Sequence, residues 1–180
     1  IHTGGPLATF VPLVFLCHSS DRSVFEASFA RSEAFGAPWT YLVTGIADQG
    51  GTDQEAHRQG VPFISTELGG GGRLRQQTVD LAKKGIYRIL NHLGVLVDCG
   101  ITEPQGSRRY LTDRGSRSLL SEMNGILETV RQQGQYVGKG ETLAIVHPIE
   151  DAFGEPLLIE SPGDGVIVSM RTSARVTYGD

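Results

Sequence analysis

The sequence predicts an α/β domain followed by a small all-β module. In the first half, apolar runs typical of buried strands alternate with segments of helical spacing, and glycine or proline separates them. After about residue 118 the helical spacing ends, and short strands divided by glycines follow. We therefore expect a mostly parallel sheet with helices in residues 1–105, and a connector with a barrel-sandwich module in residues 106–180.

Three strands and three helices are expected in the first half. The strands are the apolar runs at residues 10–17, 39–44 and 61–68. The helices are expected at residues 21–35, 52–59 and about 76–96, with Asp21 and Thr52 as N-caps and Gly36 and Gly60 as end signals. Because the strands alternate with helices, we expect right-handed crossovers and a largely parallel sheet. The polar segment 102–118 is expected to be the connector.

The second half contains an internal repeat over residues 124–146 and 164–180. Gly125-Ile-Leu-Glu-Thr-Val-Arg and Val137-Gly-Lys-Gly-Glu recur as Gly165-Val-Ile-Val-Ser-Met-Arg and Val176-Thr-Tyr-Gly-Asp. Two such units can pair as halves of a small sandwich and cover each other's apolar faces. We expect equivalent strands to begin at Gly125 and Gly165, with an exposed hairpin at 151–156.

The two ends of the sequence suggest a truncated chain. The first residue is not Met and lies in an apparent strand, whereas the second repeat stops before a counterpart of the strand at 142–146. We expect this missing strand to leave an open edge that is prone to pairing with another chain.

Composition excludes several classes of protein. The net charge is −4, the acids and bases are interspersed, and no basic patch for nucleic acid is visible. The longest apolar run, Phe10 to Cys17, is too short to span a bilayer, and no signal-peptide pattern is present. Cys17 and Cys99 lie far apart, which favours buried thiols over a disulfide or a metal site. We expect a cytoplasmic protein that binds neither nucleic acid nor membrane and that can form a homo-oligomer.

Glu67 is the first candidate for chemistry. It ends an apolar strand and precedes the four glycines at 69–72. Ligands of open α/β sheets bind at the carboxyl ends of strands, and glycines let a backbone or a ligand approach closely. A carboxylate at this place suits a general base, although a surface Glu before a flexible loop has the same local pattern.

His2 is the candidate metal ligand. It lies at an apparent strand end and precedes the small residues Thr3, Gly4 and Gly5, so its imidazole could hold zinc open to substrate. The alternative is a solvated terminal histidine. His147-Pro-Ile-Glu150 matches a His-x-x-Glu pattern, but the proline disfavours a helix there, and we interpret the match as coincidence.

The two motifs together resemble a known family. His-Thr-Gly-Gly at residues 2–5, followed about sixty residues later by Thr-Glu-Leu-Gly-Gly-Gly-Gly at 66–72, resembles the succinylglutamate desuccinylase/aspartoacylase family. The glycine run looks most like the branch that includes N-acetyl-diaminobutyrate deacetylases. The resemblance covers nearly the whole chain and implies a zinc-carboxypeptidase-like α/β domain, one Zn²⁺ and hydrolysis of a small N-acyl amino acid.

The resemblance also implies roles for the two candidates. His2 matches the later metal-binding histidine of the family, and Glu67 matches the carboxylate that activates the attacking water. The family's His-x-x-Glu pair would precede Ile1, so this polypeptide has one of three ligands, and we expect it alone to bind no zinc tightly and to be inactive. Arg58 lies near where a basic substrate contact of the family would fall. We expect His2 and Glu67 to face one cavity at the carboxyl edge of the sheet.

Two other functions remain open at this stage. One is a zinc carboxypeptidase that acts on peptides, against which the β module argues because it could crowd the cleft. The other is a non-catalytic α/β protein with a lipoyl-like binding module, since Val137-Gly-Lys-Gly-Glu resembles a turn of such modules. Residues 147–164, where the modified lysine would lie, contain no lysine. The sequence does not identify the acyl group or the amino acid.

Overall fold

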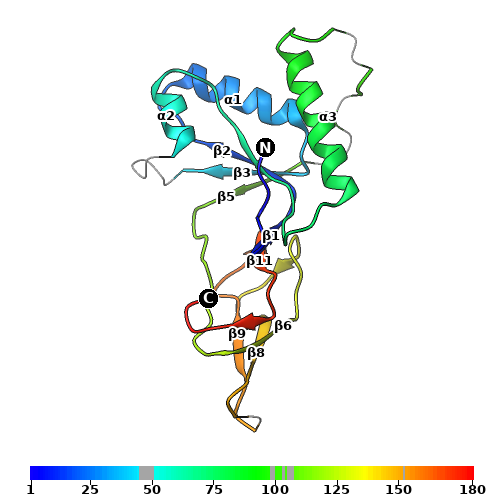
Figure 1. The fold of residues 1–180 in the computed structure, drawn as a ribbon. Helices are drawn as coiled ribbons and strands as arrows, with labels where there is room; N and C mark the ends of the chain where they lie inside the picture. The colour runs from blue at the N-terminus through cyan, green and yellow to red at the C-terminus, as the bar shows by residue number, and fades with distance from the viewer. Residues whose placement is uncertain (45–50, 98–99, 103, 105–107, 152) are drawn as a thin grey trace.

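The computed structural model describes residues 1–44, 51–97, 100–102, 104, 108–151 and 153–180. An α/β part carries the three helices, and a β part lies beside it, joined through a short two-stranded sheet (Figure 1). Among the described residues, no helix is both long and apolar enough to cross a membrane.

The sheet of the α/β part has four strands. They are, in spatial order, β4 (Ser65–Glu67), β2 (Leu13–Cys17), β3 (Trp39–Val43) and β5 (Arg109–Thr112). The pairs β2–β3 and β3–β5 are parallel, whereas β2–β4 is antiparallel. The antiparallel β4 differs from the crossover expected for residues 61–68. Residues 61 and 63 bond to helices instead, since Val61 N donates to Ala56 O and Phe63 N donates to Ser28 Oγ.

The polar segment expected to be a connector supplies β5. Arg109 to Thr112 pair in register with Trp39 to Leu42, so the sheet extends beyond the boundary predicted at residue 105. Of the four residues of β5, only Leu111 is half-buried, and the other three are exposed. An edge strand with one inward apolar side chain does not produce the apolar run by which the other strands were recognised.

The helices α1 (Arg22–Phe35), α2 (Thr52–Arg58) and α3 (Gln76–His92) follow the predicted order. Asp21 caps α1 as predicted, because its carboxylate accepts from Ser23 N at 2.9 Å and Val24 N at 3.3 Å, and Gly36 ends the helix in the left-handed region. The predicted cap Thr52 is wrong: Gly51 is the N-cap of α2, without a side-chain bond. Helix α3 ends at His92, earlier than expected.

One face of the sheet is covered by α1 and α3. The buried cluster there consists of Val14, Phe35, Ala37 and Leu68, against which Ile64, Leu81, Ala82 and Ile89 pack. Gly85 of α3 is the contact point, because a Cβ built on it would lie 2.4 Å from the Phe35 ring. A mid-helix glycine costs about 1 kcal/mol relative to alanine, and here that cost allows the two helices to approach.

A second cluster joins the two parts of the molecule. Val11, Leu13 and Trp39 are its buried residues, and Val166 and Val168 of the β part pack against them. The predicted strand 10–17 is divided at Val11 and Pro12. Residues before the division form β1 (Ala8–Phe10), which pairs antiparallel with β11 (Ser169–Arg171) of the β part. Pro12 cannot donate a ladder hydrogen bond, so the chain changes partner there.

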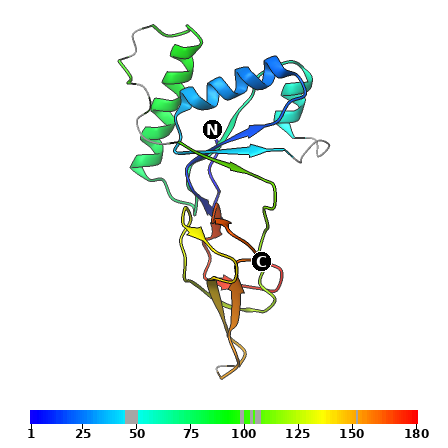
Figure 2. The same cartoon turned by 180° about the vertical axis from the view of Figure 1, so that it is seen from behind.

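The β part contains two paired sets of strands. One sheet has the order β12 (Arg175–Val176), β6 (Gly125–Thr129), β8 (Thr142–Pro148) and β9 (Leu157–Glu160). The other pairs β7 (Tyr136–Val137) with β10 (Gly165–Val166). The hairpin between β8 and β9 projects away from the rest of the molecule, and Phe153 on it is 99% exposed (Figure 2).

The two sequence repeats are paired reciprocally. Val137 of the first copy pairs with Gly165 of the second, and Val176 of the second pairs with Gly125 of the first. The turns of the two copies also make equivalent hydrogen bonds, each to the serine just before the other copy. Gly140 N donates to Ser161 O, and Gly179 N donates to Ser121 O, each at 2.8 Å. These matched contacts relate the copies by a pseudo-twofold axis. A counterpart of β8 in the second copy would follow Asp180, so the open edge expected there stays a prediction.

Candidate functional site

The structure brings His2 and Glu67 together. His2 Nδ1 lies 2.7 Å from Glu67 Oε1, and the backbones of the two residues form a parallel bridge. Two further contacts fix this register, because His2 N donates to Thr66 Oγ1 at 3.1 Å and Leu68 N donates to His2 O at 3.2 Å. Sixty-five positions apart in sequence, the two residues thus share one side-chain hydrogen bond.

The two side chains differ in exposure. The His2 side chain is 73% exposed, whereas that of Glu67 is 14% exposed. Glu67 Oε2 is fully buried and has no hydrogen-bond partner among the described residues. A buried polar atom without a partner costs free energy, so such an atom in a folded protein points to a ligand, a water or a reacting group. Here it is a carboxylate oxygen with free lone pairs beside an imidazole.

The predicted sheet edge needs a correction. Glu67 does lie at the carboxyl end of its own strand, but β4 is antiparallel to β2, and Glu67 pairs with Leu13, the first residue of β2. The pair therefore lies at the edge of the sheet where β2 and β3 begin. The prediction assumed a parallel β4, for which all carboxyl ends would meet at one edge.

The glycine run after Glu67 lies against the segment that follows His2. Gly71 N donates to Ala8 O and Gly72 N to Gly5 O, each at 2.9 Å, while Gly4 N donates to Gly69 O at 3.1 Å. A Cβ built on Gly70 would lie 2.1 Å from Ala8 O, and φ at Gly70 is 141°. The close approach that these glycines allow is therefore that of backbone to backbone, which fixes the two loops to one another.

The β part reaches the same loops through Thr172. This residue follows β11; its backbone N donates to Leu7 O at 3.0 Å and its Oγ1 donates to Pro6 O at 2.6 Å. Figure 1 shows β1 and β11 together at the junction of the two parts. Sequence reasoning missed Thr172, because a threonine in a β-rich segment carries no local signal of a contact with residues 166 positions earlier.

The donors at this edge fit part of a zinc site. Imidazole nitrogen and carboxylate oxygen are both common zinc ligands, and a catalytic zinc site uses three protein ligands with one open position. Within the part of the chain that the structure describes, no three His, Cys, Asp or Glu side chains are arranged to hold a metal. The exposed imidazole of His2 is therefore a donor of the kind that such a site uses, and the free oxygen of Glu67 lies beside it.

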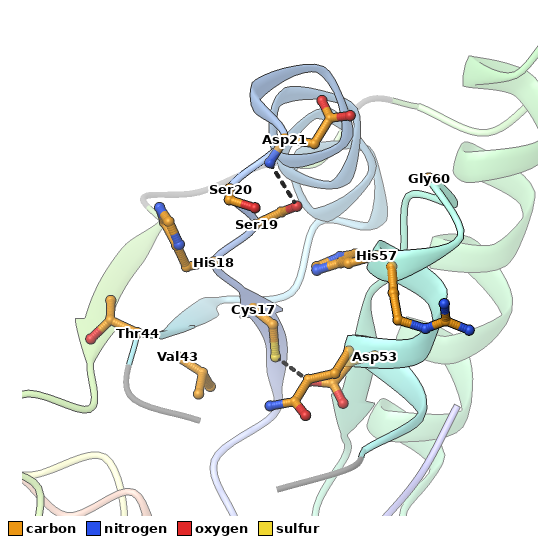
Figure 3. A pocket seen from close by; sticks show the side chains of 12 residues that line it. Cys17, His18, Ser19, Ser20, Asp21, Val43, Thr44, Asp53, His57 and Gly60 are labelled. Atoms are coloured by element: carbon orange, nitrogen blue, oxygen red, sulfur yellow. Dashed lines mark hydrogen bonds between the residues drawn. The ribbon is translucent and has the colours of Figure 1, made fainter. Parts of the chain in front are cut away.

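A cavity of about 580 Å³ lies at the other edge of the sheet, where β2 and β3 end (Figure 3). Cys17, His18, Thr44, Asp53 and His57 are among its lining residues. Cys17 Sγ donates to Asp53 Oδ2 at 2.5 Å, and burial, followed by this contact, raises the pKa of the thiol to about 12. A thiol that stays protonated at neutral pH is a poor nucleophile, so Cys17 does not form a catalytic pair with either histidine described in this cavity, His18 or His57.

The remaining sequence candidates lie away from the His2–Glu67 pair. Arg58 lines the cavity at the opposite edge and bonds to Glu55, with Nη2 2.7 Å from Oε1. His147 Nε2 lies 2.7 Å from Glu128 Oε2 on the neighbouring strand, which agrees with rejecting it as half of a metal motif. Cys17 is a free thiol, and Cys99 lies outside the described residues.

Comparison with known proteins identifies relatives of the chain. A family model described as the succinylglutamate desuccinylase/aspartoacylase catalytic domain matches residues 1–93. The N-alpha-acetyl-L-2,4-diaminobutyric acid deacetylase of Halomonas elongata is 29% identical over 181 residues, covering all of this chain and 53% of the relative.

Solved structures of similar proteins match the fold of this chain. The product-bound ectoine utilization protein EutE (DoeB) from Ruegeria pomeroyi has a TM-score of 0.87 and 29% identity, and the match covers 99% of this chain and 54% of that one. A succinylglutamate desuccinylase from Silicibacter sp. TM1040 has a TM-score of 0.84 and 28% identity, with coverage of 99% and 54%. The chain thus spans about half the length of the relatives it matches.

Proposed function

Because the chain belongs to the succinylglutamate desuccinylase/aspartoacylase family, we propose that the complete protein hydrolyses the amide bond of a small N-acylated amino acid. The similarity to an N-acetyl-diaminobutyrate deacetylase and to an ectoine utilization protein favours an acetylated diamino acid over the aspartate and glutamate derivatives. This choice of substrate rests only on the sequence similarity of the chain to these two relatives.

The observation that carries the proposal is the His2–Glu67 pair. Hydrolysis of an amide without a covalent intermediate needs a group that takes a proton from water and later gives one to the leaving amine. Glu67 has a free, buried carboxylate oxygen for this task, and its other oxygen is held by His2. The Cys17 thiol lies at the opposite edge, and its raised pKa of about 12 keeps it protonated at neutral pH.

Zn²⁺ is the proposed cofactor, with His2 as one of its ligands. A bound zinc ion lowers the pKa of water toward neutrality and polarises the acyl carbonyl. The described residues supply too few donors for the complete site, so further ligands would have to come from elsewhere in the complete protein. His2 is suited to its part because its imidazole is exposed while its backbone is fixed by Thr66 and Leu68.

In the proposed mechanism, Glu67 moves the protons. The Glu67 carboxylate accepts the proton from water as the oxygen attacks the acyl carbon, and the protonated carboxyl then transfers that proton to the nitrogen of the breaking amide bond. The products are a free carboxylic acid and the amino acid amine. Partial burial of Glu67 excludes bulk water from the carboxylate and thereby strengthens its interactions with the reacting atoms.

The β part begins after β5 in the sequence, and we propose that it is a structural module of this enzyme. Its reciprocal repeats resemble the two halves of a lipoyl-like unit, but the hairpin between β8 and β9 has no lysine to carry a prosthetic group. Its contact with the loop between His2 and β1 supports a position beside the substrate site, where it would favour small substrates over peptides. This contact favours the deacylase over the peptidase alternative.

Substrate and metal can be tested together on the complete protein. We expect purified, zinc-loaded protein to release acetate from N-acetyl-2,4-diaminobutyrate faster than it hydrolyses N-acetylaspartate, N-succinylglutamate or an acetylated tripeptide. Dialysis against a chelator should abolish activity, and stoichiometric Zn²⁺ should restore it. Preferential hydrolysis of the peptide would support the peptidase instead, and full activity after chelation would exclude the zinc mechanism.

A further inference from the structure

The segment between His2 and β1 is held from two sides. On one side the glycine run bonds to it through Gly71 N and Gly72 N, which donate to Ala8 O and Gly5 O. On the other side Thr172 donates to two consecutive carbonyls, Leu7 O from its backbone and Pro6 O from its hydroxyl. The segment that follows the proposed zinc ligand therefore lies between the loop after Glu67 and the end of β11.

Thr172 also contacts the glycine run itself. A Cβ built on Gly71 would lie 3.0 Å from Thr172 Cγ2, so the methyl group of the threonine occupies the space beside that glycine. The threonine is placed there by the pairing of β11 with β1, in which Ala8 lies opposite Arg171. One side chain of the β part thus touches both loops that leave the His2–Glu67 pair, with its hydroxyl on one loop and its methyl on the other.

We propose that Thr172 is a positioning residue that keeps the His2 and Glu67 loops in register, so that the β part contributes to the geometry of the reaction. The inference rests on the proposed hydrolase function. The side chain of His2 is 73% exposed and is held by Glu67, so the segment that follows His2 is a further constraint on its position. A displacement of a reacting group by about 1 Å can cost roughly a hundredfold in rate.

The hydroxyl and the methyl of Thr172 can be removed separately in the complete protein. Thr172→Val deletes the hydroxyl and keeps a methyl, whereas Thr172→Ser keeps the hydroxyl. We expect Thr172→Val to lower kcat about tenfold with KM within about twofold, and Thr172→Ser to restore most of the lost kcat. Thr177→Val is the matched control, since it removes a hydroxyl bonded to Asp180 in the same part of the chain, and it should leave kcat unchanged.

A second readout does not depend on activity. Amide hydrogen exchange by NMR should be faster at Gly71 and Gly72 in Thr172→Val than in wild type, because their acceptors lie on the segment that the hydroxyl holds. Unchanged exchange would overturn the inference, and so would faster exchange with an unchanged kcat in an active enzyme. A wild-type protein that hydrolyses no N-acyl amino acid would instead overturn the proposed function and, with it, the catalytic meaning of the contact.

If Thr172→Val does not fold, a pair of variants takes its place. Gly71→Ala places a methyl against that of Thr172 and should lower kcat, in addition to the strain of a positive φ. The double variant Gly71→Ala/Thr172→Ser removes the opposing methyl and should recover part of the loss. Strictly additive effects of the two substitutions on kcat would show that the side chains do not interact, and would overturn the proposal.

Discussion

The two edges of the α/β sheet each place a carboxylate against a titratable side chain, with opposite chemical results. At the edge where β2 begins, Glu67 uses one oxygen on His2 and keeps the other free. At the edge where β2 ends, Asp53 accepts a hydrogen bond from the Cys17 thiol, whose pKa is raised to about 12. A cavity of about 580 Å³ accompanies the second pair, so the presence of a cavity does not by itself identify a reactive edge. The proposal places the reaction at the first edge because a carboxylate oxygen without a partner among the described residues lies there beside an imidazole.

The two edges are also built differently. The His2–Glu67 edge consists of two backbone segments bonded to each other, with glycines where a Cβ would collide. The opposite edge is lined by side chains of β2, β3 and α2 around open space (Figure 3). The reaction proposed for His2 and Glu67 needs fixed geometry, and direct backbone contact provides it with few side chains.

The largest expected effect separates the two carboxylates. Glu67→Gln in the complete, zinc-loaded protein should lower kcat by about two to four orders of magnitude, since an amide cannot accept the proton, while zinc content stays the same. Asp53→Asn, the matched change at the other edge, should leave kcat within about threefold. Steady-state kinetics and elemental analysis check both. Equal losses of kcat in the two variants would contradict the assignment of the reaction to the Glu67 edge.

The next effect concerns the backbone contact at the His2–Glu67 edge. Gly70→Ala should destabilise the protein by about 3 kcal/mol, because the new Cβ would meet Ala8 O at 2.1 Å and because φ of 141° at Gly70 is unfavourable for alanine. Gly72→Ala is the control, with φ of 65° and no neighbour of its Cβ closer than 3.8 Å, and should cost about 1 kcal/mol. Urea unfolding of the two variants measures the difference. Equal destabilisation would mean that positive φ, and not contact with residues 4–8, requires the glycines.

At the opposite edge, the Cys17 thiol predicts a dependence on alkaline pH. Folding raises the pKa of this group above its ordinary value of 9.0, so the fold favours the protonated thiol. The resulting stabilisation is present below about pH 9 and is lost as the pH rises from there toward 12. Wild-type protein should therefore lose more stability between pH 8 and 11 than Cys17→Ser.

Comparing wild type with Cys17→Ser cancels the contribution of Tyr110, which titrates in the same pH range in both proteins. Burial and Glu33 raise the pKa of Tyr110 as well, so both proteins should become less stable at alkaline pH. Urea unfolding midpoints measured at several pH values give the two slopes. Identical slopes would show that Cys17 does not titrate with a raised pKa in the folded state.

The smallest expected effect is at Arg58. Its guanidinium is exposed, pairs with Glu55 three residues earlier in α2, and lies at the edge away from Glu67. Arg58→Ala should therefore change neither KM nor kcat, and the melting temperature should shift little, because exposed ion pairs contribute little stability. A large rise in KM alone would restore Arg58 as a substrate contact and move the substrate to the opposite edge.

Elements with local sequence signals could be predicted without knowledge of the fold. Helix α1 begins after Asp21 and ends at Gly36 as predicted, since capping involves atoms within a few residues. The repeat around Gly125 and Gly165 was visible as repeated letters, and the motifs around His2 and Glu67 indicated the family that the comparisons show. The roles of His2 and Glu67 and the zinc remain predictions.

Which segments pair with each other follows from long-range packing. The antiparallel direction of β4, the addition of the polar strand β5 and the change of partner at Pro12 all depend on pairings between distant segments. The same holds for Cys17 with Asp53 and for Thr172 with Pro6. A hydrogen bond between residues far apart in sequence leaves no periodic pattern in either of them, so its existence follows from the packing of the whole chain and not from the local order of its residues.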